Sequence, residues 1–314
     1  MKAFALTTVD QPASLVDLPD PETAPGALRV RIRAATVNGF DVGQATGMFM
    51  GMMPHELPTV IGRDFAGVVD AVSDGRSDVA VGDEIFGVVP WTPPLHDGSF
   101  ADVIASADLI FARKPAGLSF ESAAALGLAG VAALDSVEAV DPKTGDIVVI
   151  AGATGGVGSI AVQLVAQRGA TVVATARAGD EEAFVRGLGA SETVDYSTGD
   201  VAEQIRARYP DGIDALIDLV NRDEAASALA ALVRDGGRLA TTLGTADAEG
   251  LATRAVRATN VNASPTPQKL ASLAMPAASG DLQVHIQQTF VLADVGAALA
   301  AFSAGTTGKI AVVA

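Results

Sequence analysis

The chain has 314 residues, of which 49% are hydrophobic and 18% charged, so it holds enough apolar material for a folded core and is long enough for two domains. Its net charge of -16 at pH 7 disfavours nucleic acid and membrane partners, because an acidic surface repels phosphate groups. The absence of cysteine excludes disulfides, thiolate nucleophiles and cysteine-ligated zinc.

The three histidines, His55, His96 and His285, are widely spaced, so a zinc site built from histidine and carboxylates is disfavoured and we expect no metal. The opening segment MKAFALTTVDQPASL lacks the pattern of a signal peptide. No uninterrupted apolar run is long enough to span a bilayer. We therefore expect a cytoplasmic protein.

Residues 1–117 are punctuated by glycine and proline and contain short β patterns. Residues 28–33 (LRVRIR) alternate apolar and cationic side chains, which is typical of a half-buried strand. Similar runs predict strands at 64–73, 83–89 and 100–111. This part of the chain is predicted to be a mostly antiparallel β domain.

Residues 118–263 alternate between strand and helix patterns. Residues 119–140 predict a helix capped by Ser119, and residues 146–151 (DIVVIA) predict a strand buried on both faces. The remaining predicted elements are helices at 156–167 and 223–234 and strands at 171–175, 215–220 and 238–243. This order predicts a doubly wound parallel sheet.

Residues 264–314 return to mixed structure. They predict helices at 267–278 and 294–303 and strands at 282–290 and 309–313. We expect this tail to complete the first domain. The predicted protein is therefore α/β, with residues 1–117 and 264–314 in a β domain and residues 118–263 in a nucleotide-binding domain.

A glycine-rich turn joins the predicted strand 146–151 to the helix that follows it. Its residues are Ala153, Thr154, Gly155, Gly156, Val157 and Gly158. Gly155 allows backbone to approach a pyrophosphate, Gly158 allows close helix–strand packing, and the helix N-terminus attracts phosphate. Ala153 replaces the first glycine of the usual pattern, and an ordinary tight turn is the alternative interpretation.

Arg177 ends the next predicted strand, where NAD-binding proteins usually carry an acidic residue for the ribose hydroxyl. A guanidinium suits a 2′-phosphate by charge and geometry, so this position predicts NADPH. The alternative is that Arg177 only stacks on the adenine. Asp180, Glu181 and Glu182 follow closely and weaken the positive potential.

Further motifs accompany the turn in a fixed order along almost the whole chain. They are residues 37–41 (VNGFD), 58–69 (PTVIGRDFAGVV), 82–87 (GDEIFG), 188–190 (LGA), 195–196 (DY), 236–239 (GGRL) and 308–310 (GKI). With these motifs the chain resembles the zinc-free quinone oxidoreductases of the medium-chain dehydrogenase/reductase superfamily. The turn and the G-x-D-x-A-G segment are the specific pieces.

The resemblance implies a GroES-like domain, a Rossmann domain and a homodimer. It also implies that zinc-dependent relatives carry a cysteine at the position of Asn38 and a histidine at that of Arg63. Asn38 and Asp41 are implied to lie near the nicotinamide as catalytic candidates. Asn38 could donate to a carbonyl oxygen or could simply tie down a turn, and Asp41 could hold the loop.

The implied pocket departs from the family pattern. Tyrosines common at the positions of Gly43 and Phe49 are absent, and a methionine-rich segment, residues 48–53, stands there. This segment could line an apolar pocket or be a surface flap. The candidate pocket residues are Phe40, Met48, Phe49 and Trp91. The lysine that many relatives use for the 2′-phosphate is Glu181 here, which leaves Arg177 with Tyr196 as its neighbour.

The remaining candidate cofactor contacts are Val220, Leu243, Gly244 and Lys309. The predicted function is hydride transfer from NADPH to a quinone or other conjugated carbonyl. Reduction of an enone or enoyl-thioester double bond is the alternative on the same scaffold. An NADPH-binding sensor or structural protein with little catalysis is the alternative of another class. The sequence identifies no proton donor.

Overall fold

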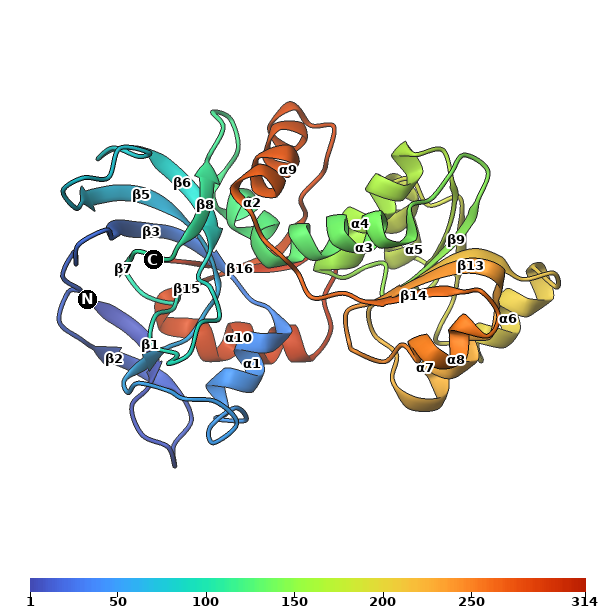
Figure 1. Ribbon diagram of the computed structural model, residues 1–314, viewed down its shortest axis with the longest axis horizontal. Helices are drawn as coiled ribbons and strands as arrows, with labels where there is room; N and C mark the ends of the chain where they lie inside the picture. The colour runs from blue at the N-terminus through green and yellow to red at the C-terminus, as the bar shows by residue number, and fades with distance from the viewer. The chain divides into compact units, whose positions relative to one another are not determined.

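The computed structural model describes all 314 residues and divides into two compact units (Figure 1). Unit 1 comprises Met1–Ala129 and Pro265–Ala314, and unit 2 comprises Gly130–Ser264. The first boundary therefore lies at 129/130, later than the predicted 117/118. The reason is that helix α2 (Phe120–Ala125) packs against the strands of unit 1, so this helix belongs to the β domain.

Unit 1 is built around two sheets. The larger has the strand order β15-β16-β3-β5-β6-β8, with β7 also pairing with β3, and the smaller has the order β2-β1-β4. All pairs are antiparallel except β15 with β16, which confirms the predicted mostly antiparallel domain. The bounds are β1 (Lys2–Leu6), β2 (Ser14–Asp17), β3 (Leu28–Thr36), β4 (Thr59–Val60), β5 (Asp64–Val72), β6 (Glu84–Val88), β7 (Val103–Ser106), β8 (Ile110–Arg113), β15 (Ile286–Val291) and β16 (Lys309–Val313).

The helices of unit 1 cover these sheets. They are α1 (Gly39–Ala45), α2, α9 (Pro267–Ser279), the 3-10 turn η2 (Leu292–Asp294) and α10 (Val295–Ser303). Helix α10 contributes Val295, Ala298 and Leu299 to a core shared with β1, β3 and β16. The predicted strand at 100–111 is two strands, β7 and β8, separated by residues 107–109.

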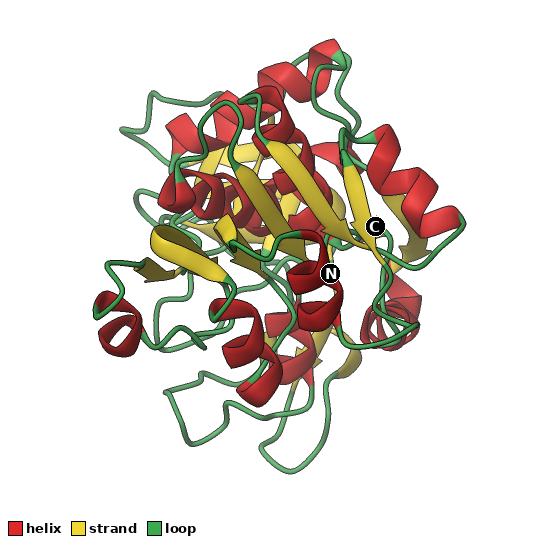
Figure 2. Ribbon diagram, turned by 90° about the vertical axis from the view of Figure 1, so that its right-hand side faces the viewer, coloured by secondary structure: helices red, strands yellow, loops and turns green.

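Unit 2 contains the predicted parallel sheet, with helices packed around it (Figure 2). The sheet has six strands in the order β11-β10-β9-β12-β13-β14, of which β11 and β14 were not predicted. Its strands are β9 (Ile147–Ala151), β10 (Thr171–Thr175), β11 (Glu192–Val194), β12 (Ile213–Asp218), β13 (Val233–Thr241) and β14 (Arg257–Asn260). Its helices are α3 (Val131–Val140), α4 (Gly156–Gln167), α5 (Asp180–Gly187), α6 (Val201–Arg208), α7 (Asp223–Ala230) and α8 (Ala248–Ala252). With right-handed crossovers, this order puts α4 and α5 on one face and α6, α7 and α8 on the other.

The helix predicted at 119–140 contains a π-helical turn, η1 (Leu126–Gly130), between α2 and α3. Ser119 caps the run as predicted, accepting a hydrogen bond from the amide of Ser122. The run Phe120–Val140 is long and apolar enough to cross a membrane by length and composition, although Glu121, Asp135 and Glu138 interrupt it. In the structure 72% of that apolar window is buried, as in the core helix of a folded domain.

Candidate functional site

The glycine-rich turn of unit 2 lies between β9 and α4, as predicted. Gly152, which precedes the predicted turn, has a φ of +82° and supplies the left-handed residue that Ala153 cannot. A Cβ on Gly158 would collide with the Gly152 carbonyl and lie 2.6 Å from the Cα of Ala153, so close strand–helix packing requires glycine there. A Cβ on Gly155 would meet only the Gly152 oxygen, at 3.6 Å, so no packing inside the protein requires that glycine.

The first turn of α4 presents a phosphate-sized set of donors. Gly155 is the N-cap and offers no side-chain cap, and the first turn carries no acidic residue. The first amides of a helix have no partner within it, so the amides of Gly156 and Val157 are available to an anion, and the helix dipole favours one. These residues fit the pyrophosphate of a dinucleotide.

A cavity of about 370 Å³ adjoins this turn within unit 2. It is lined by Ala151, Gly152, Thr154, Thr175, Tyr196, Val201, Val220 and Asn221. It lies at the carboxyl ends of β9, β10 and β12, which is where open α/β sheets bind ligands. The structure thus brings together Thr154, Tyr196 and Val220 from the predicted cofactor set.

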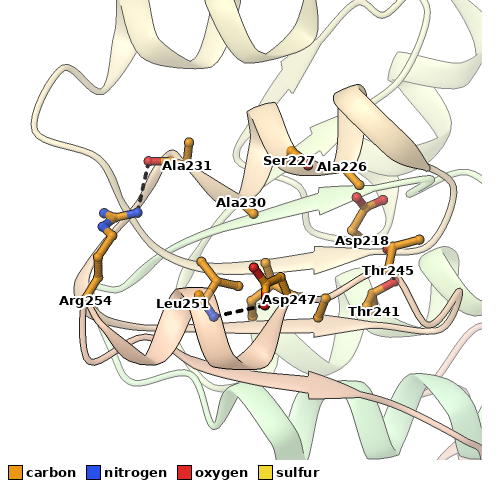
Figure 3. Close-up of a pocket in the computed structure, with 13 residues that line it drawn as sticks. Asp218, Ala226, Ser227, Ala230, Ala231, Thr241, Thr245, Asp247, Leu251 and Arg254 are labelled. Atoms are coloured by element: carbon orange, nitrogen blue, oxygen red, sulfur yellow. Dashed lines mark hydrogen bonds between the residues drawn. The ribbon is translucent and has the colours of Figure 1, made fainter.

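A second hollow of unit 2, of about 240 Å³, is lined by different residues (Figure 3). It lies among α7, α8, β12 and β13, and its polar groups have partners inside the chain. Asp247 accepts from the Gly250 amide, and Arg254 donates to the Ala231 carbonyl. None of the predicted cofactor residues lines this hollow. Leu243 and Gly244 follow β13 and line neither cavity.

Arg177 follows β10, as predicted, but its charge already has a partner. Its Nε and Nη2 lie 2.8 and 2.5 Å from Oε1 of Glu181, and its backbone amide donates to Oε2 at 2.9 Å. The Tyr196 hydroxyl donates to the same carboxylate at 2.9 Å, and its ring centre lies 5.9 Å from the Arg177 guanidinium. We call Arg177, Glu181 and Tyr196 the arginine triad.

The carboxylate of the triad is ionised. Burial opposes its ionisation, but hydrogen bonds from Arg177 and Tyr196 outweigh burial and hold the pKa of Glu181 below its usual range. Arg177 is 60% exposed and Glu181 only 12%, so the guanidinium faces solvent while its counter-ion lies beneath it. A 2′-phosphate would therefore meet an arginine that is already neutralised.

In unit 1 a buried carboxylate, Asp64 at the start of β5, organises four hydrogen-bond donors. Oδ2 accepts hydrogen bonds from the Thr36 hydroxyl at 2.7 Å and from the side-chain amide of Asn38 at 2.8 Å, and the Lys309 ammonium lies 3.4 Å from it. Oδ1 accepts from the Leu128 amide in the π-helical turn at 2.8 Å. We call Asp64 and these four residues the Asp64 network.

Two predicted roles are altered by this network. The Asn38 side-chain nitrogen donates to Asp64 and, at 3.4 Å, to the Thr36 carbonyl, so it has no free hydrogen for a substrate carbonyl. The Lys309 ammonium donates to Asn38 Oδ1 at 2.7 Å and to the Val37 carbonyl at 2.8 Å in addition to Asp64. Its three hydrogens are thus engaged inside unit 1, and the cofactor contact expected of Lys309 is not supported.

Asp41 in α1 is fully buried, and its Oδ2 accepts a hydrogen bond from the backbone amide of Asn38 at 2.8 Å, which holds the loop as expected. Its other oxygen, Oδ1, has no hydrogen-bond partner. Burial, then the neighbouring Asp64 charge, raise the pKa of Asp41 to about 7, although Lys309 and Arg63 oppose this shift. Asp41 therefore changes charge near neutral pH.

Three of the four predicted pocket residues form one aromatic cluster. The ring centres of Phe40 and Phe49 are 4.7 Å apart and stacked, and that of Trp91 lies 3.9 Å from Phe40 and 5.5 Å from Phe49. A Cβ on Gly43 would lie 3.0 Å from the Phe49 ring. The Phe49 ring therefore occupies the space that a larger side chain at position 43 would need. Met48 is 65% exposed.

Arg63 lies beside this cluster, and the sequence analysis gave it no role. Its guanidinium carbon lies 5.4 Å from the centre of the Phe40 ring and 6.0 Å from that of Trp91. Its Nε donates to the Val89 carbonyl, and its terminal nitrogens form neither an ion pair nor a hydrogen bond. Burial lowers the pKa of the Arg63 guanidinium, while the Asp41 and Asp64 charges oppose this shift.

Sequence reasoning therefore missed Arg63, Asp64 and Gly152. A signal for the first two was present, because two adjacent charges interrupt the otherwise apolar run 60–69. Buried charges of this kind need partners, and those partners come from remote segments. The ion pair of Arg177 with Glu181 was also readable, because the two residues are four apart at the start of a predicted helix.

Known families match both units. Residues 24–110 match the alcohol dehydrogenase GroES-like domain, and residues 188–312 match a family described as zinc-binding dehydrogenase. The structure of a quinone oxidoreductase from Coxiella burnetii superposes with a TM-score of 0.88 and 27% identity, over 100% of this chain and 99% of that one. The chain belongs to the medium-chain dehydrogenase/reductase superfamily. It is one of the quinone-oxidoreductase-like members, as the sequence motifs predict.

Two curated relatives of this superfamily member are plant proteins. The 2-methylene-furan-3-one reductase of Solanum lycopersicum is 31% identical over 76% of this chain and 61% of its own length. The chloroplastic NADPH-dependent alkenal/one oxidoreductase of Arabidopsis thaliana is 29% identical over 70% of this chain and 55% of its own length. The alignments thus span a little over half of each relative.

The zinc in the name of one matching family has no counterpart among the residues of this superfamily member. The chain has no group of three histidine, cysteine, aspartate or glutamate side chains arranged to hold a metal ion. At the two positions where the resemblance implies zinc ligands stand Asn38, which is held by Asp64, and Arg63, which is a cation. These residues do not fit a catalytic zinc.

Proposed function

We propose that this protein is a zinc-independent reductase that transfers a hydride from NADPH to a quinone or another conjugated carbonyl acceptor. The observation that carries the proposal concerns Gly155 in the β9–α4 turn. A Cβ at this position would contact only the Gly152 oxygen, so this glycine leaves room for a ligand and not for another part of the protein. The cavity beside that turn has a volume suited to part of a dinucleotide. The superfamily membership and the named activities of the plant relatives support the same class of reaction.

The chain's own residues bind and orient the reactants in this proposal. The amides of Gly156 and Val157 hold the pyrophosphate, and Tyr196 and Val220 line the cavity that takes the adenosine. Arg177 faces the 2′-phosphate. When bound, NADPH supplies the hydride. The aromatic cluster of unit 1 offers apolar ring surface to a planar acceptor.

An enone or enal is the second candidate acceptor. The two plant relatives are named for reduction of a methylene-furanone and of alkenals and alkenones, which contain a carbon–carbon double bond next to a carbonyl. The pocket also lacks the two tyrosine hydroxyls that quinone oxidoreductases often have, since Gly43 and Phe49 stand there.

The homodimer, the cytoplasmic location and the exclusion of nucleic acid partners stay predictions.

The decisive experiment is an NADPH oxidation screen with 1,4-benzoquinone, 2-cyclohexenone and crotonyl thioester, with NADH in parallel. We expect turnover with at least one acceptor and a higher kcat/KM for NADPH than for NADH. Tight NADPH binding without oxidation by any acceptor would identify a sensor or structural protein. Turnover with NADH alone would remove the cofactor assignment.

A pair of glycine substitutions tests the turn itself. Gly155→Ala is expected to weaken NADPH binding at least about tenfold with little change in Tm, because the protein has room for this methyl group and the pyrophosphate does not. Gly158→Ala is expected to lower both affinity and Tm, because its methyl group meets backbone. Unchanged NADPH affinity in Gly155→Ala would separate this turn from the cofactor.

A further inference from the structure

Unit 1 contains a cation whose hydrogen-bonding capacity is largely unused. Arg63 precedes β5 and its side chain is partly exposed, with Nε fixed on the Val89 carbonyl. The backbone is fixed at the same place, because the Val89 amide donates to the Arg63 carbonyl at 2.8 Å. The side chain is thus anchored at its inner end, while its terminal N–H groups have no partner in the chain.

A partly buried guanidinium normally satisfies its five N–H donors, and it keeps its proton in proteins. The nearby carboxylates of Asp41 and Asp64 interact with Arg63 only through space and form no ion pair with it. Asp64 is occupied by its network, and Oδ2 of Asp41 accepts from the Asn38 backbone amide, while Oδ1 of Asp41 forms no hydrogen bond with Arg63 or with any other donor. The terminal nitrogens of Arg63 are therefore available for an oxygen atom that is not part of this chain.

The rings around Arg63 indicate the shape of the group that carries this oxygen. The rings of Phe40, Phe49 and Trp91 form a continuous aromatic surface beside the guanidinium, and Trp91 is 40% exposed. Aromatic faces favour planar conjugated rings, and arginine favours carbonyl or anionic oxygens. A planar molecule with a carbonyl at its edge satisfies both.

We propose that Arg63 binds the carbonyl oxygen of the acceptor and stabilises the negative charge that reduction places on it, with the aromatic cluster contacting the acceptor's planar face. This inference rests on the proposed reductase function. It gives Arg63, at one of the positions where zinc-dependent relatives place a metal ligand, the task of polarising the oxygen. The other candidates for that task, Asn38 and Lys309, have their N–H groups engaged in the Asp64 network.

The charge balance of the step is simple. When a conjugated ketone accepts a hydride from the nicotinamide reductant at its β-carbon, the double-bond electron pair moves to the carbonyl oxygen and gives an enolate. Hydrogen bonds from Arg63 stabilise the negative charge on that oxygen. In a low-dielectric site this electrostatic stabilisation is much stronger than the same contact would be in water. Water then protonates the α-carbon, and Arg63 keeps its own proton throughout.

Substitution of Arg63 tests the proposal. Arg63→Met is expected to lower kcat/KM for the acceptor about a hundredfold or more, with NADPH affinity unchanged within about twofold. Arg63→Lys is expected to retain part of the activity, because lysine keeps the charge without the planar pair of donors. Added guanidinium ion is expected to restore turnover in Arg63→Ala, which a purely structural role would not allow.

Arg76 in unit 1 is the matched control. It also lies over an aromatic ring, 5.5 Å from the centre of Phe111, but it is ion-paired with Asp78. Arg76→Met is expected to leave turnover within about twofold of wild type. An equal loss of turnover in the Arg76 and Arg63 variants would overturn the assignment, since both losses would then reflect general disturbance of unit 1.

A binding measurement that does not depend on turnover completes the test. Trp91 is the only tryptophan in the chain and lies beside Arg63, so saturable quenching of its fluorescence by 2-cyclohexenone or 1,4-benzoquinone reports acceptor binding. We expect saturation in wild type and a linear, collisional response in Arg63→Met. Full activity and saturable quenching in Arg63→Met would overturn this inference alone. An inactive wild type that binds NADPH would instead overturn the proposed function.

Discussion

The two arginines to which our proposals give roles, Arg177 in unit 2 and Arg63 in unit 1, have opposite environments. Arg177 is 60% exposed and forms a close ion pair with Glu181, whereas Arg63 is partly buried and forms none. Exposure screens the first pair, so its charge matters for ligand choice more than for folding. The second arginine has no internal partner for its terminal nitrogens. A guanidinium whose terminal nitrogens have no partner within the folded chain indicates that their partner is a bound ligand.

The largest effect is expected in unit 1, at the buried ion pair of the Asp64 network. Lys309→Met should lower the free energy of unfolding by about 3–5 kcal/mol, because it leaves the fully buried Asp64 charge without its cation. Chemical denaturation measures this change. Lys143→Met, which breaks an exposed pair with Asp141, should have little effect and serves as the control. A loss below about 1 kcal/mol in Lys309→Met would show that Thr36 and Asn38 suffice for Asp64.

The next effect concerns the pH dependence of stability through Asp41. Its folded pKa of about 7 lies above the usual value near 4, so the folded state binds a proton more tightly than the unfolded state. The corresponding stability is complete below pH 4 and is lost as pH rises to 7. Burial and then the Asp64 charge raise this pKa, while the Asn38 backbone amide, Lys309 and Arg63 lower it.

The test is Asp41→Asn, which keeps an oxygen to accept from the Asn38 amide. Relative to wild type, this variant should gain about 2–3 kcal/mol between pH 5 and pH 8. Paired denaturation curves at the two pH values measure the gain. A difference that does not change with pH would show that Asp41 is ionised throughout this range.

A smaller effect is expected from the arginine triad of unit 2. Glu181→Gln should tighten NADPH binding about fivefold to tenfold and leave NADH binding unchanged, because it removes a carboxylate that competes with the 2′-phosphate for Arg177. Glu182→Gln, at the neighbouring carboxylate paired with Arg186, is the matched control. Equal tightening of both cofactors would place the effect outside the phosphate contact.

The smallest effect is expected on folding when Arg177 itself is replaced. Arg177→Met should shift Tm by no more than about 2 °C, because the ion pair is exposed to solvent. Thermal unfolding without cofactor measures this shift. A much larger loss of Tm would remove the contrast between a ligand-directed arginine in unit 2 and a buried charge network in unit 1.

Local patterns in the sequence predicted most of the fold. The buried run of β9, the start of α4 at Gly156 and the cap at Ser119 depend on neighbouring residues, and all three are confirmed. The π-helical turn was not predictable, because it is fixed by a hydrogen bond from Leu128 to Asp64, 64 residues away. The unit boundary moved for a similar reason, since the packing of α2 on remote strands decides it.

In the candidate site, too, features that depend on neighbouring residues were predictable and features that depend on remote residues were not. The glycine-rich turn between β9 and α4 is a contiguous motif, and its position was predicted with its residue numbers. The engagement of Asn38 by Asp64 and Lys309 was not predictable, because Lys309 is 271 residues from Asn38 in the chain. Which N–H groups remain free for a substrate is a property of such long-range partners, and no local pattern carries that information.

The insertion of unit 2 into unit 1 has a consequence for synthesis on the ribosome. The two ends of unit 2 are tied together, because the Ser264 amide and hydroxyl both donate to Asp135. This unit can therefore close as soon as its own residues have emerged. Strand β3 must wait much longer, since Ala34–Thr36 pair with Ala311–Val313, which lie far downstream of unit 2 in the chain. The nascent β domain thus keeps an open sheet edge until residues 311–313 have emerged, which makes it the part most exposed to aggregation and to chaperones.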